Sequence, residues 1–130
     1  MIPVKILLFS ADVSLARLVS RCLIKSGYRV AQASHGIGAL DLIHSEKPAL
    51  IILDLILPGV SSLAIIRAMR EEEINGRIPV ILMGANMGEE DVLSGMEVGA
   101  DLCLLEMFHP QVFIARVRSL LRRTEPSRVY

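Results

Sequence analysis

The sequence has no net charge, few cysteines and no long apolar run. Its 14 basic and 14 acidic side chains balance over 130 residues, which argues against a general nucleic-acid or membrane-surface binder because both need a basic excess. Two cysteines are too few for a disulfide framework, and both stand inside apolar runs, as expected of buried free thiols in a reducing cytoplasm. The longest uncharged stretch, 55–66, has 12 residues, well short of the ~20 that a membrane-spanning helix needs. We therefore expect a cytoplasmic protein without a membrane segment.

The chain is rich in apolar residues. They make up 52% of the sequence against 22% charged residues, a balance that excludes intrinsic disorder. The length favours one compact unit, and the sequence shows no repeat and no second domain. We expect one domain over residues 1–123, with 124–130 as a tail or the start of a linker to an effector domain.

Five short apolar runs alternate with segments of helical periodicity. Several of the runs are nearly continuous Ile, Leu and Val, the pattern of strands covered on both faces. Helix ends are indicated by Ser26-Gly27, Pro48 and Gly99, and a helix start by Pro110. This alternation predicts a doubly wound α/β fold, with a parallel sheet and helices on both faces. The strands are expected at 4–9, 29–33, 49–54, 78–83 and 102–105.

Asp54 is the most informative single residue. It ends the apolar run 50–53, and ligands of open α/β sheets collect at the carboxyl ends of the strands. One interpretation is a carboxylate that caps the following loop. The other is a functional group, since an ionisable side chain beside a buried strand is costly.

Several motifs have a distinctive order and spacing. Asp54 is followed by Leu-Ile-Leu-Pro-Gly at 55–59, the run Ile-Pro-Val-Ile-Leu stands at 78–82, and Gly-Met-Glu-Val-Gly-Ala-Asp stands at 95–101. Phe108, Pro110 and the ending 115–123 follow. In this order and spacing the motifs resemble the receiver domain of response regulators. The resemblance covers nearly the whole chain and implies a flavodoxin-like (βα)₅ fold with five parallel strands.

The resemblance also implies where phosphoryl chemistry would sit. Receivers accept a phosphoryl group on the aspartate matched by Asp54, which this chain keeps. Two acidic residues after the first strand normally hold Mg²⁺, but those positions are Ser10 and Ala11 here. Asp12 follows at a position that is often acidic in the family but is not a usual ligand. The metal site thus lacks the carboxylates that Mg²⁺ requires.

Three further positions depart from the family pattern. Gly84 stands where a Thr or Ser hydroxyl normally bonds the phosphoryl group, and Cys103 replaces the aromatic switch residue. Glu106 replaces the lysine that pairs with a phosphoryl oxygen, which turns an attraction of about 4 kcal/mol at 4 Å into a repulsion. We expect Asp54 and Glu106 to lie close enough to raise the pKa of at least one of them.

These departures favour a non-enzymatic, phosphorylation-independent receiver of an atypical response regulator, without a cofactor. It would act in signal transduction and transcription regulation through protein–protein contact. One alternative is a conventional receiver that a histidine kinase phosphorylates on Asp54 with Mg²⁺. A second is a small-ligand-binding flavodoxin-like domain that uses the pocket around Ser10, Asp54, Gly84 and Glu106.

The protein partner we expect is a second copy of the chain. Receivers of the winged-helix transcription-factor class often dimerise through the fourth helix, fifth strand and fifth helix, where a salt bridge joins the two helices. The two positions of that bridge are Val92 and Val112 here, which would give an apolar patch. Exposed apolar patches mark interfaces. We expect no direct contact with nucleic acid or membrane. The predicted interface residues are Val92, Met96, Leu102, Val112, Phe113 and Arg116.

Overall fold

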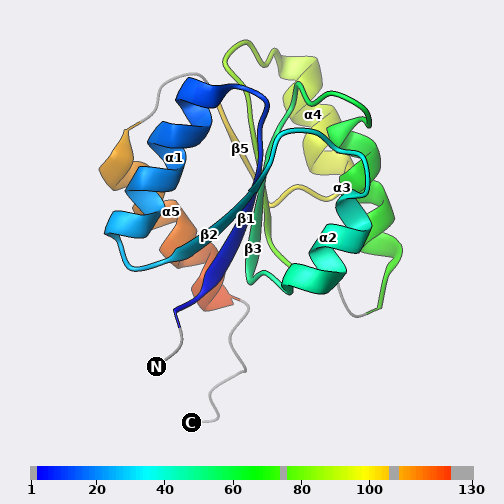
Figure 1. Cartoon of the computed structure of the whole chain (residues 1–130). Coiled ribbons are helices and arrows are strands. Elements are labelled where there is room, and N and C mark those ends of the chain that lie inside the picture. Colours follow the sequence, from blue (N-terminus) through cyan, green and yellow to red (C-terminus); the bar gives the residue numbers. More distant parts are fainter. Residues whose placement is uncertain (1–2, 74–75, 106–108, 124–130) are drawn as a thin grey trace, which may run out of the picture.

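The computed structural model describes residues 3–73, 76–105 and 109–123. Five strands alternate with five helices along these residues (Figure 1). The strands are β1 (Lys5–Phe9), β2 (Arg29–Ala33), β3 (Leu50–Asp54), β4 (Val80–Met83) and β5 (Leu102–Leu104). The helices are α1 (Val13–Lys25), α2 (Ala39–Glu46), α3 (Ser62–Glu71), α4 (Glu89–Val98) and α5 (Pro110–Arg123).

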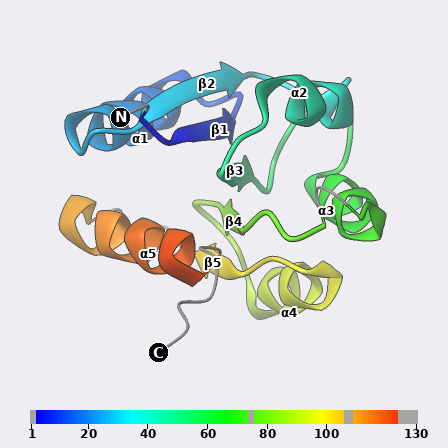
Figure 2. The ribbon, with the colours of Figure 1, turned by 90° about the horizontal axis from the view of Figure 1, so that it is seen from below.

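The strands form one parallel sheet in the order β2-β1-β3-β4-β5. Helices α1 and α5 cover one face of the sheet, and α2, α3 and α4 cover the other (Figure 2). The predicted doubly wound, flavodoxin-like fold with five parallel strands is confirmed.

The core lies on both sides of the sheet because alternate side chains of a strand point to opposite faces. In β1, Ile6 and Leu8 pack toward α1 and α5, whereas Leu7 and Phe9 pack toward α2 and α3. Every residue of β3 and β4 is buried. The continuous apolar runs of the sequence therefore correspond to strands that are covered on both faces.

The helix ends lie where the sequence predicts them. The backbone N–H of Ser26 donates to the carbonyl of Cys22 after the last turn of α1, and Gly27 takes a left-handed conformation at φ +95°. Gly99 ends α4 in the same way, and α5 begins at Pro110. Strand β4 begins at Val80, two residues later than expected, because Pro79 has no N–H for the ladder.

Phe113 belongs to the core, and its predicted place in an interface is wrong. Its side chain is 2% exposed and packs in the cluster that α1, α5 and one face of the sheet share. The buried residues of α5 are Phe113, Ile114, Val117 and Leu120, a stripe with helical spacing. Val112, one position earlier, is exposed because a single step turns a helix by about 100°.

No helix among the described residues is long and apolar enough to cross a membrane.

Candidate functional site

Asp54 lies at the carboxyl-terminal edge of the sheet, at the end of β3. Its side chain is 7% exposed. Ser10 follows β1 and Gly84 follows β4, so the sheet brings these predicted site residues to the same edge as Asp54. Parallel strands end at one edge, which explains how residues distant in sequence gather there.

Both carboxylate oxygens of Asp54 accept hydrogen bonds from the protein. The hydroxyl of Ser10 donates to Oδ2 at 3.0 Å, and the backbone N–H of Ile56 donates to Oδ1 at 3.2 Å. The main-chain carbonyl of Asp54 accepts a further bond from the Ser62 hydroxyl at 2.5 Å, which fixes the start of α3 against the end of β3. The carboxylate is therefore held by neutral donors.

Burial raises the pKa of the Asp54 carboxyl above its ordinary value. The hydrogen bonds from Ser10 and Ile56 act in the opposite direction, because they stabilise the charged form. The negative charge of Asp12 adds to the increase. Burial is the main cause of this increase. Glu106 lies outside the described residues, so its predicted pairing with Asp54 stays a prediction.

Asp12 is a helix cap. Its Oδ1 accepts a hydrogen bond from the backbone N–H of Leu15 at 3.0 Å, which satisfies a free donor in the first turn of α1. Its own N–H donates to the Ser10 hydroxyl oxygen at 3.2 Å. Asp12 and the neighbouring Ala11 are both exposed. These contacts explain the acidic side chain at position 12 without a ligand.

Gly84 leaves little room for a larger side chain. A Cβ atom built on it would lie 3.1 Å from Cγ of Met87 and 3.4 Å from Cβ of Leu55. The Met87 side chain is flexible and can shift to admit a hydroxyl-bearing residue. The backbone N–H of Gly84 is already used, since it donates to the Leu104 carbonyl at 3.2 Å.

Cys103 lies in β5 and is half-buried. Its Sγ donates a long hydrogen bond of 4.0 Å to the carbonyl of Val92 in α4, and burial raises the pKa of the thiol. A Cβ atom on Gly95 of α4 would lie 3.3 Å from this Sγ. The small side chain at the predicted switch position therefore packs closely beneath α4.

The residues that the structure describes at this edge do not fit a Mg²⁺ ion. Mg²⁺ needs one or two carboxylates free to enter a near-octahedral shell. Ser10 and Ala11 supply no carboxylate, each oxygen of the buried Asp54 already accepts one hydrogen bond, and Oδ1 of Asp12 caps α1. Within the described ranges, no group of three or more His, Cys, Asp or Glu residues is placed to hold a metal ion.

The predicted interface residues are distributed over α4, β5 and α5. Met96 and Val112 are 48% and 53% exposed, and Arg116 is exposed. Val92 and Leu102 are half-buried, and Leu102 packs against the core. The structure also shows Leu93 of α4 as 62% exposed, one helical turn from Met96.

Arg70, in the last turn of α3, makes a network of contacts with the chain on either side of β4. Its guanidinium donates to the carbonyls of Gly76, Ile78 and Gly99 and to Oδ2 of Asp101 at 2.9 Å. The same Asp101 oxygen accepts the N–H of Val80 at 2.8 Å. These contacts tie α3 to the starts of β4 and β5. The sequence does not indicate them, because Arg70 there is only the first of four consecutive charged residues.

Comparison with known proteins identifies the family. The family model described as "Response regulator receiver domain" matches residues 6–118. The chain belongs to this family. The receiver domain is 32% identical over 126 residues to the phosphate regulon transcriptional regulatory protein PhoB of Pseudomonas aeruginosa, a match that covers 97% of this chain and 55% of PhoB.

A second relative is the alkaline phosphatase synthesis transcriptional regulatory protein PhoP of Bacillus subtilis. It is 36% identical over 121 residues, which cover 93% of this chain and 50% of PhoP. The receiver domain thus spans about half the length of these curated relatives.

Two solved structures agree with the fold of the receiver domain. One is the BeF3-activated N-terminal receiver domain of Klebsiella pneumoniae RstA, with a TM-score of 0.83, 29% identity and coverage of 91% of this chain and 98% of that one. The other is the receiver domain of the Francisella response regulator 1452, with a TM-score of 0.83, 26% identity and coverage of 93% and 98%.

Proposed function

We propose that this chain is a phosphorylation-independent receiver domain of an atypical two-component response regulator. The observation that carries the proposal is the hydrogen bond from the Ser10 hydroxyl to Oδ2 of Asp54 at 3.0 Å. A neutral donor stands there in place of an acidic metal ligand. The phosphoacceptor-equivalent aspartate is thus built into the protein's own hydrogen bonds, and the domain transmits a signal through contact with other proteins.

The charges around Asp54 also oppose phosphoryl transfer. The reaction requires an ionised nucleophile and cations or donors that neutralise the charge on the transferred group. Gly84 supplies no hydroxyl to the transferred group. Glu106, outside the described residues, stands in the sequence where the family has a lysine. A lost attraction of about 4 kcal/mol at position 106 would by itself slow the reaction strongly, because each tenfold loss of rate corresponds to about 1.4 kcal/mol.

The proposed partner is a second copy of the chain, bound through α4, β5 and α5. The exposed apolar side chains Leu93, Met96 and Val112 support this surface, and Phe113 does not contribute to it. Arg116 of α5 adds an exposed cation to this surface, whereas Asp101, beside β5, is paired with Arg70 of the same chain.

In this proposal, residues 1–123 form the regulatory module and 124–130, outside the described residues, lead to an effector domain. The printed names of PhoB and PhoP, both transcriptional regulatory proteins, support an output in transcription regulation. The receiver itself makes no direct contact with nucleic acid or membrane in this proposal, and it acts in the cytoplasm.

Intact-mass measurement after incubation with acetyl phosphate and Mg²⁺ tests the proposal. The wild-type chain is expected to gain no phosphoryl group. The matched positive control restores the family pattern with Ser10→Asp, Ala11→Asp, Gly84→Thr and Glu106→Lys, and is expected to gain one. A mass increase of the wild type that Asp54→Asn abolishes would establish the conventional receiver instead, and a histidine kinase would then be its partner.

A further inference from the structure

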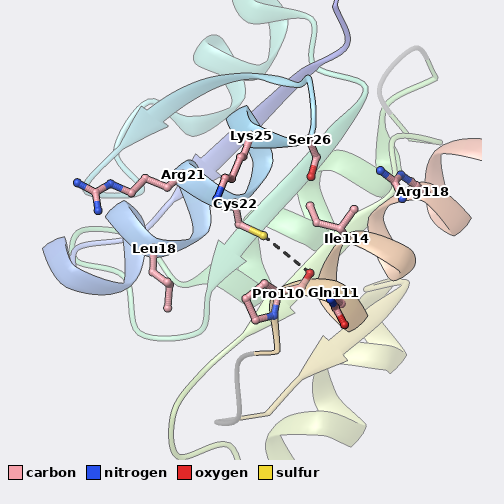
Figure 3. Close-up of a pocket in the computed structure, with 9 residues that line it drawn as sticks. All are labelled: Leu18, Arg21, Cys22, Lys25, Ser26, Pro110, Gln111, Ile114 and Arg118. Carbon is pink, nitrogen blue, oxygen red and sulfur yellow. Dashed lines mark hydrogen bonds between the residues drawn. The ribbon is translucent and has the colours of Figure 1, made fainter.

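A groove runs between α1 and α5, on the face of the sheet opposite α2, α3 and α4 (Figure 3). Its volume is about 550 Å³, within the range of small-molecule sites. Residues of α1 and α5, together with the cap residue Ser26, form it, and neither Asp54 nor Gly84 lines it. The groove is a separate feature from the carboxyl-terminal edge of the sheet.

The floor of the groove is apolar. Ile114 of α5 is buried below it, Cys22 of α1 is half-buried, and Leu18 of α1 adds an exposed apolar side chain at one end. The Sγ of Cys22 donates to the carbonyl of Pro110 at 3.8 Å, so a direct contact joins the two walls (Figure 3). An apolar molecular body is the complement to such a floor.

The rim of the groove is cationic. Arg21 and Lys25 of α1 and Arg118 of α5 line it, with no acidic side chain among the lining residues. Within the described part of the chain, none of these three cations has a carboxylate at salt-bridge distance. Helices α1 and α5 together carry seven cationic side chains and no acidic one. The groove therefore has a positive potential although the whole chain has no net charge.

The cations are not equally placed. In Figure 3, Ser26 and Arg118 are both drawn next to Ile114, whereas the guanidinium of Arg21 points away from the groove. An anionic group above Ile114 would thus meet Arg118 first. A guanidinium binds a carboxylate or phosphate with two parallel hydrogen bonds.

We propose that the α1–α5 groove binds a small amphiphile with an apolar body and an anionic head group. The body lies against Ile114, Cys22 and Leu18. The head group, a carboxylate or a phosphate ester, pairs with Arg118, and Lys25 adds positive charge to the same rim. The site goes beyond the proposed regulatory function, since it shares no residue with the Asp54 end of the sheet or with the exposed apolar surface of α4.

Two observations favour this ligand over a free anion or a large partner. A free anion would leave the apolar floor in water, and Ile114 and Cys22 would contribute nothing to its binding. A volume of about 550 Å³ suits a small molecule, and apolar contact with a few placed polar groups is the usual composition of such sites. The cationic rim favours an amphiphile with an anionic head group over an uncharged one.

The test is a titration of the 130-residue chain with decanoate and with decyl phosphate, each below its micellar concentration, followed by amide NMR. We expect saturable binding at one site, with shifts concentrated in α1 and α5. Decanol is expected to bind at least tenfold more weakly, and inorganic phosphate to cause no saturable shift. The decanoate and decyl phosphate arms show which head group the site prefers.

The variant Arg118→Gln with Lys25→Gln is expected to weaken the binding of the preferred amphiphile at least tenfold. Arg67→Gln with Arg77→Gln removes the same charge at positions outside the groove and should leave the affinity unchanged. Circular dichroism confirms that both variants fold. Equal binding by decanol, unchanged affinity of the first variant, shifts outside α1 and α5, or no saturable binding of either charged amphiphile would overturn the proposal.

Discussion

The Ser10 hydroxyl donates a hydrogen bond to Oδ2 of Asp54 across 3.0 Å and thereby joins the ends of β1 and β3. In the family pattern an acid stands at position 10, and two carboxylates side by side require a cation between them. Serine removes that repulsion and supplies a donor. Compared with the family pattern, one residue change therefore replaces a metal ligand with a hydrogen bond inside the protein.

The raised pKa of Asp54 predicts a pH-dependent gain in stability for Asp54→Asn. The unfolded chain loses this proton near pH ~3.9, before the folded chain does, so the folded state binds more protons above that pH. The aspartate's contribution to stability is thus fully present below the unfolded pKa and is lost as the pH rises through the folded pKa. Asparagine keeps an acceptor for Ile56 and a donor for Ser10 without the charge.

Urea unfolding at several pH values checks this prediction. Asp54→Asn is expected to unfold at a higher urea concentration than the wild type at pH 7, with the difference shrinking below about pH 4. Ser62→Ala serves as a control, because it removes a contact to the backbone of Asp54 but not to its carboxylate. An Asp54→Asn variant less stable than the wild type at pH 7 and equal to it at pH 3 would contradict burial as the main influence on this pKa.

The Arg70 network predicts a large loss of stability for Arg70→Ala. Three backbone carbonyls and Asp101 lose their donor, and hydrogen bonds to charged groups contribute about 1.5–3 kcal/mol each at best. We expect the free energy of unfolding to fall by about 2–3 kcal/mol, since the network is partly exposed. Arg67→Ala, on the exposed face of the same helix, should cost less than about 0.5 kcal/mol. Similar losses for both variants would show that helix α3 responds to any loss of charge.

Phe113 and Val112 provide a matched pair on adjacent positions of α5. Phe113→Ala empties a core position and is expected to cost about 3–5 kcal/mol of unfolding free energy. Val112→Ala truncates an exposed side chain and should change the free energy of unfolding by less than about 0.5 kcal/mol. Thermal or urea unfolding measures both. A small effect at Phe113 would restore it as a surface residue.

The proposed dimer surface predicts a change in mass rather than in stability. Met96→Glu with Val112→Glu places two like charges on each subunit where apolar side chains would meet, and sedimentation should show a monomer where the wild type is dimeric. Ile24→Glu, an exposed apolar position on α1, is the control and should remain dimeric. A wild type that is monomeric at high micromolar concentration would remove this surface from consideration.

The fold could be predicted because its strongest signals are local. Continuous apolar runs indicated the buried strands, and the glycine after α4 and the proline at the start of α5 marked helix boundaries. The position of Asp54 followed from the strand it ends. Phe113 was predicted on the exposed face of α5 but lies on the buried one. The spacing of Ile114 and Val117 in the sequence already indicates which side of α5 is buried.

The contacts within the site depend on geometry that the sequence does not carry. Ser10 and Asp54 are 44 positions apart, and only the pairing of β1 with β3 brings the hydroxyl to the carboxylate. The same holds for Arg70, whose partner Asp101 lies 31 positions away. In the sequence, Ser10 stands where the family has an acid, and Arg70 is one of several charged residues in a row. In the structure, Ser10 donates to Asp54 and Arg70 donates to Asp101 and to backbone carbonyls.

The acidic side chains of α4 and the cations of α1 and α5 lie on opposite faces of the sheet, which gives the neutral domain an electric dipole. Helix α4 carries four acidic side chains and no cation, whereas α1 and α5 carry cations alone. Such a molecule orients an approaching charged partner before contact, so its association rates should fall with added salt as those of a charged protein do. At physiological ionic strength the field is screened over about 8 Å, so this steering acts only on partners already near the surface.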